Sequence, residues 1–300
     1  MWFRNLRVFR LADTWTYDTA GLEAKLAAAR FAPCGASDMQ SQGWVPPRGV
    51  EEEFVFAQGR QQLIALGTEQ KLLPASVVRQ YVQARLEALE ASQGYKPGRG
   101  QIREIREQVA AELMPRAFVK RHLTYVWVDP VNRWLAIDVA SAAKADEVLE
   151  QVKRALDDLP LLPLRTLLSP STAMTQWLAA GEAAPGFTID RDCELRSGSE
   201  DKATVRYSKY LLEADEIRHH LEAGMRATRL ALTWDDRISL VLCEDMHVKR
   251  LAFLDLLKEK SEKSVGEGDD AFEADFAIMT GELARFLPQL VAALGGAAEE

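Results

Sequence analysis

The stretch from residue 113 to residue 159 constrains the fold of this chain more than any other part of it. Within it, the segments 123–128 and 133–139 both alternate apolar and polar residues, and the sequence Asp-Pro-Val-Asn at 129–132 stands between them. Alternation with a period of two is typical of a β-strand, and Asp, Pro and Asn favour a turn. We therefore predict a β-hairpin at the centre of the chain.

A helix and a basic cluster flank this hairpin. Ser141 stands where a helix N-cap is expected, and the residues that follow it place an apolar side chain on one helix face at Val148, Val152, Leu156 and Leu159. On the other side of the hairpin, positive charge gathers around an aromatic ring in Arg116, Phe118, Lys120 and Arg121. This positively charged collar on a rigid hairpin–helix unit suits the binding of a polyanion.

The remaining segments predict an α+β protein in which antiparallel hairpins and a meander pack with amphipathic helices. We expect strands at 2–11, 60–67, 187–195 and 203–211, a meander at 226–254, and helices at 19–30, 172–180, 213–223 and 273–294, the last kinked at Pro288. Residues 31–47 are rich in turn formers, and we expect an ordered loop that packs on the core through Trp44.

A second pair of helices, 77–92 and 101–113, is separated by the glycine- and proline-rich residues 92–100. Two antiparallel helices there would form a protruding helical hairpin. On the second helix, one face beside the apolar stripe carries Arg99, Arg103 and Arg106. Such a stripe can contact nucleic acid or can be a solvated surface, because Glu104 and Glu107 offset two of its charges, and the stripe alone does not decide between them.

The length of 300 residues is enough for a sizeable core and several subdomains. We divide the chain into residues 1–75 (the N-terminal part of a central α/β unit), 76–114 (the helical hairpin, or tip), 115–170 (the central hairpin–helix unit), 171–225 (a second tip-like segment) and 226–300 (the C-terminal meander and helix).

Charge is distributed unevenly along the chain. The formal net charge is −8, yet ten basic and five acidic residues lie between Lys71 and Arg121, and eleven acidic and four basic residues follow from Leu251 onward. An acidic net charge therefore does not exclude nucleic-acid binding through the basic middle of the chain. The strand 203–211 adds Arg206 and Lys209, with Tyr207 and Tyr210 interleaved.

Other classes of protein find little support. No apolar run approaches the roughly 20 residues that span a bilayer, and the N-terminus has no signal-peptide pattern, so we expect a cytoplasmic protein without a membrane partner. The three cysteines are odd in number and far apart, which argues against a disulfide framework or a zinc cluster.

Motifs for catalysis are also missing from the sequence. It contains no glycine-rich phosphate loop, HExxH, CxxC or GxSxG, and its four histidines are not at metal-ligand spacings. The acidic pairs Asp235-Asp236, Glu244-Asp245 and Asp269-Asp270 could bind a divalent ion in a nuclease, but we interpret them as turn residues. We expect no enzyme activity, no metal and no cofactor.

Many separate segments of the chain are recognisable as motifs. They are WFRNLRVFRL at the N-terminus, FAPCGASDM followed by GWVPP, KLLPASVVRQ at 71–80, MPRAF at 114–118, WLAIDVASAAKAD at 134–146, EAGMRATRLALTWDDRI at 222–238, KRLAF at 249–253 and FEADFAIMTGEL at 272–283. Together they resemble one protein family, the recombination-associated protein RdgC of bacteria. No single match is diagnostic, but the likeness is collinear over essentially the whole chain.

The resemblance implies a DNA-binding protein without known catalysis, in the cytoplasm and associated with the nucleoid. Family members bind single- and double-stranded DNA with little sequence preference, form a ring-shaped homodimer with a basic lining, and restrain the RecA recombinase. Phe118 matches a phenylalanine at the closing contact of the ring, and Lys209 a basic residue at the same gate. Tyr210 stands where the family pattern has glutamine, and residues 92–100 are glycine-rich where that pattern is lysine-rich.

From the residues and the resemblance together, we predict DNA contacts at Lys71, Arg79, Arg99, Arg103, Arg106, Arg116, Lys120, Arg121, Arg206 and Lys209, and a dimer gate at Phe118, Lys209 and Tyr210. The alternative is a regulator that binds recombination or replication proteins directly, with DNA contact secondary. A metal-dependent nuclease is a more distant alternative.

Overall fold

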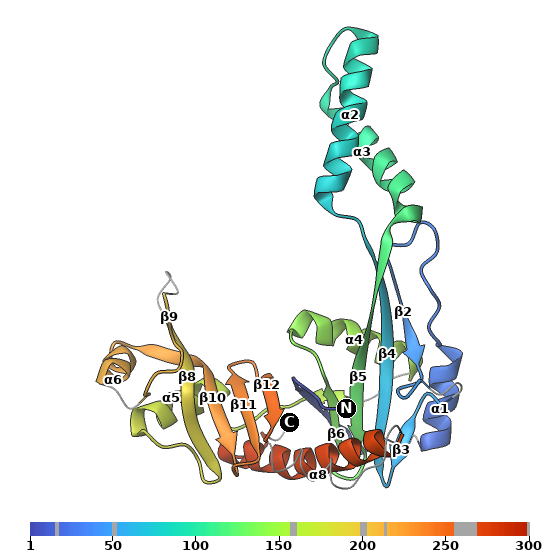
Figure 1. Ribbon diagram of the computed structural model, residues 1–300. Coiled ribbons are helices and arrows are strands. Elements are labelled where there is room, and N and C mark those ends of the chain that lie inside the picture. Colours follow the sequence, from blue (N-terminus) through green and yellow to red (C-terminus); the bar gives the residue numbers. More distant parts are fainter. Residues whose placement is uncertain are drawn as a thin grey trace.

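The computed structural model of the chain describes residues 1–15, 18–49, 53–156, 161–198, 203–212, 215–254 and 269–298. Its helices pack on two antiparallel β-sheets, which lie in two arms of the molecule, with one long helix beneath both (Figure 1). This arrangement confirms the predicted α+β class, including the protruding helical hairpin and the meander.

The first sheet has seven strands in the order β2-β4-β5-β6-β1-β7, with β3 paired to β4. They are β1 (Arg7–Leu11), β2 (Gln40–Val45), β3 (Phe56–Gln58), β4 (Gln61–Leu72), β5 (Phe118–Asp129), β6 (Trp134–Ile137) and β7 (Leu161–Pro163). β5 and β6 form the predicted central hairpin. Its turn is held by Asp129, whose Oδ1 accepts hydrogen bonds from the N–H groups of Val131 and Asn132, each at 3.0 Å.

Helices α1 (Thr19–Ala28) and α4 (Ala142–Ala155) cover one face of the first sheet. Each buries an apolar stripe with the spacing of one helix face, supplied by Leu22 and Leu26 from α1 and by Val148 and Val152 from α4. Ser141 caps α4 as predicted, because its side chain accepts a hydrogen bond from the backbone N–H of Lys144.

β4 and β5 continue beyond the sheet as a long ribbon that carries the helical hairpin at its end (Figure 1). Helices α2 (Ala75–Gln93) and α3 (Arg99–Leu113) form this hairpin and bury Val82 and Val109, and the short 3₁₀ helix η1 (Met114–Arg116) leads back into β5. Gly94 ends α2 with a φ of 77°, a left-handed conformation that favours glycine.

The second sheet has five strands in the order β12-β11-β10-β8-β9. They are β8 (Phe187–Ser197), β9 (Thr204–Tyr207), β10 (Met225–Trp234), β11 (Ile238–Cys243) and β12 (Val248–Phe253), accompanied by α5 (Pro170–Ala180) and α6 (Asp215–Glu222). The strands β10, β11 and β12 form the predicted meander. Its first turn has φ values of 47° at Asp235 and 50° at Asp236. Two successive residues with positive φ are typical of tight turns between the strands of a β-hairpin.

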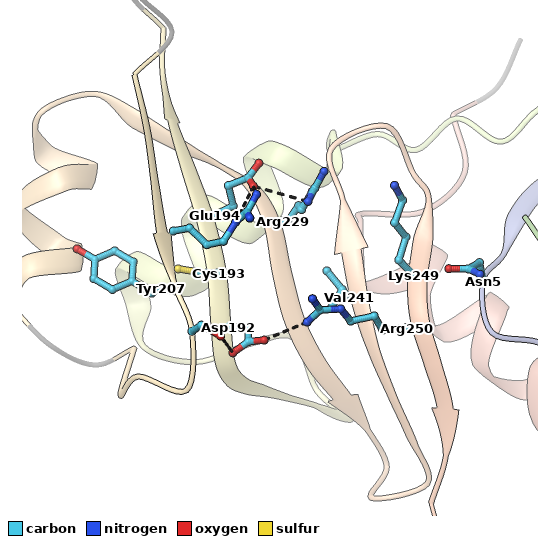
Figure 2. Close-up of a pocket in the computed structure, with 11 residues that line it drawn as sticks. Asn5, Asp192, Cys193, Glu194, Tyr207, Arg229, Val241, Lys249 and Arg250 are labelled. Carbon is cyan, nitrogen blue, oxygen red and sulfur yellow. Dashed lines mark hydrogen bonds and ion pairs between the residues drawn. The ribbon is translucent and has the colours of Figure 1, made fainter. Parts of the chain in front are cut away.

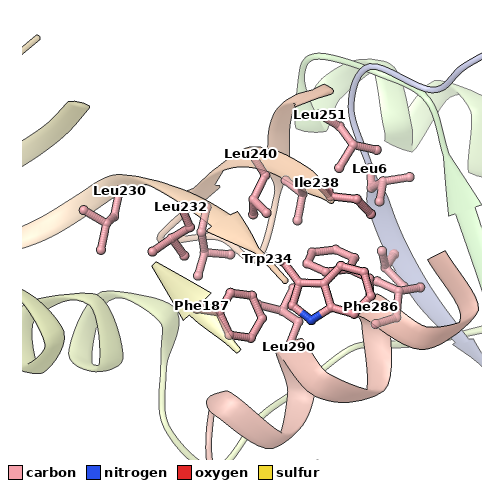
Figure 3. Close-up of a cluster of buried hydrophobic side chains, with 14 of the residues drawn as sticks. Leu6, Phe187, Leu230, Leu232, Trp234, Ile238, Leu240, Leu251, Phe286 and Leu290 are labelled. Carbon is pink, nitrogen blue, oxygen red and sulfur yellow. The ribbon is translucent and has the colours of Figure 1, made fainter. Parts of the chain in front are cut away.

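The long helix α8 (Asp269–Ala293) joins the cores of the two arms. Toward the first sheet, the ring of Phe276 lies 5.1 Å from that of Phe56. Toward the second sheet, Phe286 packs against Trp234 at 5.6 Å and against Phe187 at 6.3 Å, within the apolar cluster of Figure 3. One core therefore extends under both sheets. Pro288 lies inside this helix.

Several predicted boundaries differ from the structure. β1 begins at Arg7 instead of residue 2, and β4 continues to Leu72, beyond the predicted end at residue 67. The second half of the predicted loop 31–47 forms β2, although Trp44 packs on the core as expected and is 1% exposed. β9 ends at Tyr207, earlier than predicted, because Lys209 has a φ of 55° that a strand does not allow. Asp269-Asp270 begins α8 instead of forming a turn. Among the helices of the described ranges, none is long and apolar enough to span a bilayer.

Candidate nucleic-acid interface

The helical hairpin presents its predicted cations to solvent. Arg99, Arg103 and Arg106 on α3 are exposed, as is Arg79 on α2. Arg103 pairs with Glu107 one turn later at 2.9 Å, with 83% of its side chain exposed. Ion pairs this exposed contribute little to stability, so the guanidinium can exchange its carboxylate for a phosphate.

At the base of this hairpin, the collar of Arg116, Lys120 and Arg121 is also exposed. Arg121 is anchored: its Nε donates to Glu69 at 2.6 Å, and only 3% of the Glu69 side chain is exposed. This hydrogen bond, together with one from the backbone N–H of Cys34, lowers the pKa of Glu69. Arg121 is therefore held in place on the ribbon while most of its side chain faces solvent.

Lys71 differs from the other predicted contacts. It is 6% exposed, and its ammonium group donates to the carbonyl oxygens of Gly35 at 2.6 Å and Ala36 at 2.7 Å. This buried cation holds the 31–39 segment against β4. The ammonium group of Lys71 is therefore engaged inside the fold.

The second sheet supplies a basic surface that the sequence reasoning located only in part. One face of this sheet packs on α5 and α8 through residues such as Leu230, Leu242 and Leu251. Side chains that alternate with these core residues point to the opposite face, which we call the basic sheet face. It carries Arg196, Arg206, Arg226, Arg229, Lys249 and Arg250.

Glu194 lies in the middle of the basic sheet face and is 4% exposed (Figure 2). Its carboxylate accepts hydrogen bonds from Nη2 of Arg206 at 2.5 Å and from Oγ1 of Thr228 at 2.9 Å, and it lies 3.7 Å from both Arg196 and Arg229. Burial alone would raise the pKa of Glu194, but these hydrogen bonds and charges outweigh it and lower the pKa. This ionised carboxylate holds Arg206, while Arg196 also pairs with Glu244 at 2.8 Å. Three arginines against two carboxylates leave a local excess of positive charge.

The predicted gate residues lie on different arms of the molecule. Phe118 begins β5 at the neck, where the β4–β5 ribbon meets the helical hairpin, in the tall arm that carries the first sheet. It is 84% exposed, so it is not part of the core. Lys209 and Tyr210 follow β9 in the other arm (Figure 1). The N–H of Lys209 donates to Asp192 at 2.8 Å, and the hydroxyl of Tyr210 donates to Glu216, a bond that raises the pKa of Tyr210.

The structure therefore brings Arg206 close to Arg229, Lys249 and Arg250, whereas the arginines of α3 lie at the far end of the other arm (Figure 1). Sequence reasoning missed Arg196, Arg226, Arg229, Lys249 and Arg250. Arg226 and Arg229 of β10 are three residues apart, and an ideal strand would point them to opposite faces. Lys249 and Arg250 are adjacent in sequence, and an ideal strand would point them to opposite faces.

These features define a class of protein: an α+β protein with exposed cations on the helical hairpin and on the basic sheet face. Within the described ranges, no group of three or more His, Cys, Asp or Glu side chains is placed to hold a metal ion.

Comparison with known proteins identifies the family. Residues 1–297 match the family model described as "RdgC: Putative exonuclease, RdgC". Three relatives carry the name recombination-associated protein RdgC. The relative from Dechloromonas aromatica is 54% identical over 299 residues, which cover 99% of this chain and 98% of its own length. The relative from Janthinobacterium sp. strain Marseille is 48% identical over 300 residues, the full length of both chains. The relative from Cupriavidus pinatubonensis is 51% identical over 296 residues, which cover 99% of both chains.

This chain belongs to the RdgC family, as its sequence motifs indicated. A role in recombination follows from the names of its relatives. Those names indicate no catalysis, in contrast to the description of the family model.

Proposed function

We propose that this protein binds DNA without sequence preference, as a homodimeric ring that encircles the DNA and restrains RecA during homologous recombination. The observation that carries the proposal is the basic sheet face. It lies on a protein of net charge −8, so its cations are concentrated on one surface instead of following the overall composition. A local positive field of this kind attracts DNA, while the acidic remainder of the molecule repels it.

Exposed apolar side chains at the neck support the homodimer. Phe118 is 84% and Leu72 46% exposed, and the two pair across the β4–β5 ribbon and form an apolar patch on one of its faces. Val119 (47% exposed) and Leu123 (49%) alternate with Phe118 along β5 and lie on the opposite face. The adjoining edge of β5 is open, because β6 pairs with β5 only from Val126 onward. An open edge beside exposed apolar residues favours association with another chain.

The second contact of the proposed ring lies on the other arm, where Leu211 is 67% exposed next to Tyr210. A pocket of about 390 Å³ there is lined by Leu178, Phe187 and Leu212 among others. In a two-fold dimer each copy offers both surfaces. Phe118 of each copy then contacts the Lys209–Leu211 segment of the other copy, so the same contact occurs twice. This closes a ring without a third type of contact.

The alternative function, a regulator that binds a recombination or replication protein directly, rests on the same apolar patch. An exposed apolar patch can receive a protein partner of another kind as well as a second copy of this chain. The two functions differ in their dependence on salt, because phosphate contacts release counterions from DNA and apolar contacts between proteins do not.

Titration with salt tests DNA binding. Fluorescence anisotropy with two duplexes of unrelated sequence should give equal affinities, and log affinity should fall linearly with log salt by about 0.9 per phosphate contacted. The double variant Arg196→Gln/Arg226→Gln should flatten that slope by up to about two units for both duplexes alike. Its matched control is Lys153→Gln/Arg154→Gln, which removes the same charge from exposed positions on α4.

Equal slopes for the two double variants would contradict DNA binding by the basic sheet face. The ring is tested separately by light scattering, where the proposal requires about twice the chain mass of 33.5 kDa. A monomer at micromolar concentration would remove the ring from the proposal and leave DNA binding in place. The restraint of RecA is tested in a strand-exchange assay with purified RecA. The wild-type protein and the control variant should inhibit strand exchange, and the Arg196→Gln/Arg226→Gln variant should not.

A further inference from the structure

A pocket of about 210 Å³ opens on the basic sheet face (Figure 2). Four cationic side chains line it, against two carboxylates: Arg206, Arg229, Lys249 and Arg250, with Asp192 and Glu194. They come from four different strands, and Val241 of a fifth strand, β11, also lines the pocket. All five strands of the sheet thus contribute to one concave, positively charged site.

Two irregularities of the sheet aim extra polar side chains at this pocket. In β12 the pairing with β11 shifts between Val241–Lys249 and Ser239–Ala252, and Arg250 has a φ of 50°. Because of this β-bulge, Lys249 and Arg250 both leave the core face, while the next residue, Leu251, stays buried.

Strand β10, on the other side of β11, has a similar irregularity. Its pairing with β8 shifts between Ala227 and Arg229, so that Ala227 and Leu230 both pack in the core, and Thr228 and Arg229 both lie beside Glu194. Positive φ is uncommon for residues other than glycine, and a β-bulge interrupts the regular pairing of a strand. Two such departures that deliver side chains to one pocket indicate a built site.

The two carboxylates fix the cations without neutralising them. Arg206 donates to Glu194 through Nε and Nη2, and Arg250 pairs with Asp192 at 3.2 Å. The side chains of Arg206 and Arg250 nevertheless remain 66% and 76% exposed. A guanidinium has five N–H donors, so donors remain for a ligand. Lys249 makes no ion pair with any residue that the structure describes, and Arg229 approaches Glu194 only to 3.7 Å. Preorganised donors of this kind favour anion binding, because ordering them at the moment of binding costs little.

We propose that this pocket is a phosphate subsite, which holds one phosphate group of a DNA strand through Arg229, Lys249 and Arg250 while Glu194 positions Arg206 at its wall. The proposal rests on the DNA-binding function proposed above and gives it a defined contact. The volume is below the roughly 300–1,000 Å³ of pockets for drug-sized ligands, which suits one phosphate with its sugar. The phosphate belongs either to a phosphodiester within a strand or to a phosphomonoester at a strand end.

A short ligand isolates the pocket from the rest of the basic sheet face. We would titrate the full-length protein with a thymidine trinucleotide, with and without a 5′ phosphate, and follow binding by calorimetry. The pocket variant is Lys249→Gln/Arg250→Gln, and its matched control is Lys153→Gln/Arg154→Gln, which removes the same charge from exposed positions on α4 outside the pocket. An unchanged melting temperature confirms that each variant is folded.

We expect the affinity of the pocket variant for the trinucleotide to fall about tenfold for each cation that no longer reaches the phosphate, and the control to stay within about twofold of the wild type. If both trinucleotides bind more weakly by the same factor, the pocket takes an internal phosphodiester. If only the 5′-phosphorylated one is affected, the pocket takes a strand end. Either result supports the phosphate subsite.

Trinucleotide binding that is equal in the pocket variant and the wild type overturns the subsite. Binding of long duplex DNA, measured on the same samples, shows in that case whether the DNA-binding function itself stands. A hexaglutamate peptide provides the last comparison. If it binds the wild type more tightly than either trinucleotide and binds the pocket variant weakly, the pocket receives an acidic protein segment and the proposal is wrong.

Discussion

Phe118 offers the sharpest test of the proposed ring, because its truncation should have little effect on folding and a large effect on dimerisation. Its side chain is 84% exposed, so Phe118→Ala removes almost no burial from the folded subunit, and we expect its free energy of unfolding to change by less than about 0.5 kcal/mol. Phe286→Ala is the matched core control. That residue is 0% exposed, and such a truncation costs about 3–5 kcal/mol.

The effect on association can be worked from the same exposure. Fully burying a phenylalanine contributes about 1.5–3 kcal/mol, so the 84% still exposed leaves about 1.3–2.5 kcal/mol to be gained at the contact. A two-fold dimer contains the contact twice, so Phe118→Ala should weaken dimerisation by about 2.5–5 kcal/mol, or about 60-fold to 4,000-fold in Kd.

Sedimentation equilibrium measures the dimer Kd, and thermal melting of the same samples measures folding. Retention on a closed circular plasmid, compared with the same plasmid after linearisation, should fall together with dimerisation. A dimer Kd equal to that of the wild type would refute the assignment of Phe118 to the closing contact. A loss of stability equal to that of Phe286→Ala would refute the exposed position on which the calculation depends.

Three further predictions follow from the structure. Changing Arg99, Arg103 and Arg106 together to Gln should keep the fold, since Gln and Arg have similar helix propensity, and should flatten the salt slope of DNA binding by up to about three units if all three contact phosphates; an unchanged slope would make this face a solvated surface. Burial lowers the pKa of His247, so the unfolded chain binds more protons below about pH 6.5, and stability should fall as the pH drops below that value; His247→Gln should make unfolding, followed by urea titration at several pH values, less sensitive to acid than in the wild type. Lys71→Met leaves two carbonyl groups without their donor and should lower the unfolding free energy by about 1–3 kcal/mol while the salt slope of DNA binding stays constant; a flatter slope would return Lys71 to the DNA interface.

The local elements of this fold could be predicted from the sequence because their signals are local. Ser141 caps α4 and Asp129 holds its turn through short-range hydrogen bonds, both of which follow from residue type and spacing. The two helices of the helical hairpin were likewise marked by apolar periodicity and by the glycines between them. The exposure of Phe118 does not follow from such local signals, because an apolar residue between two cations can lie in a core or on a contact surface.

The site could be predicted only in part, because its residues meet through pairings that no local signal records. Arg206, Arg229 and Arg250 lie on three strands of one sheet, and the sequence does not give the order of those strands. The bulges are a second reason. Strict alternation would point Lys249 and Arg250 to opposite faces, and only the register shift brings them together. Lys71 shows the reverse case, since a lysine in a basic segment binds carbonyl groups inside the fold.

The helix α8 has a mechanical consequence for DNA loading. It is clamped to the tall arm through Phe276 and to the other arm through Phe286, both 0% exposed, so changing the angle between the arms would break fully buried aromatic contacts. The helix therefore acts as a strut that fixes the angle between the two sheets of each subunit. For the proposed ring, we expect a circular DNA molecule to enter when a contact between copies separates, so that the lifetime of this contact sets the loading rate.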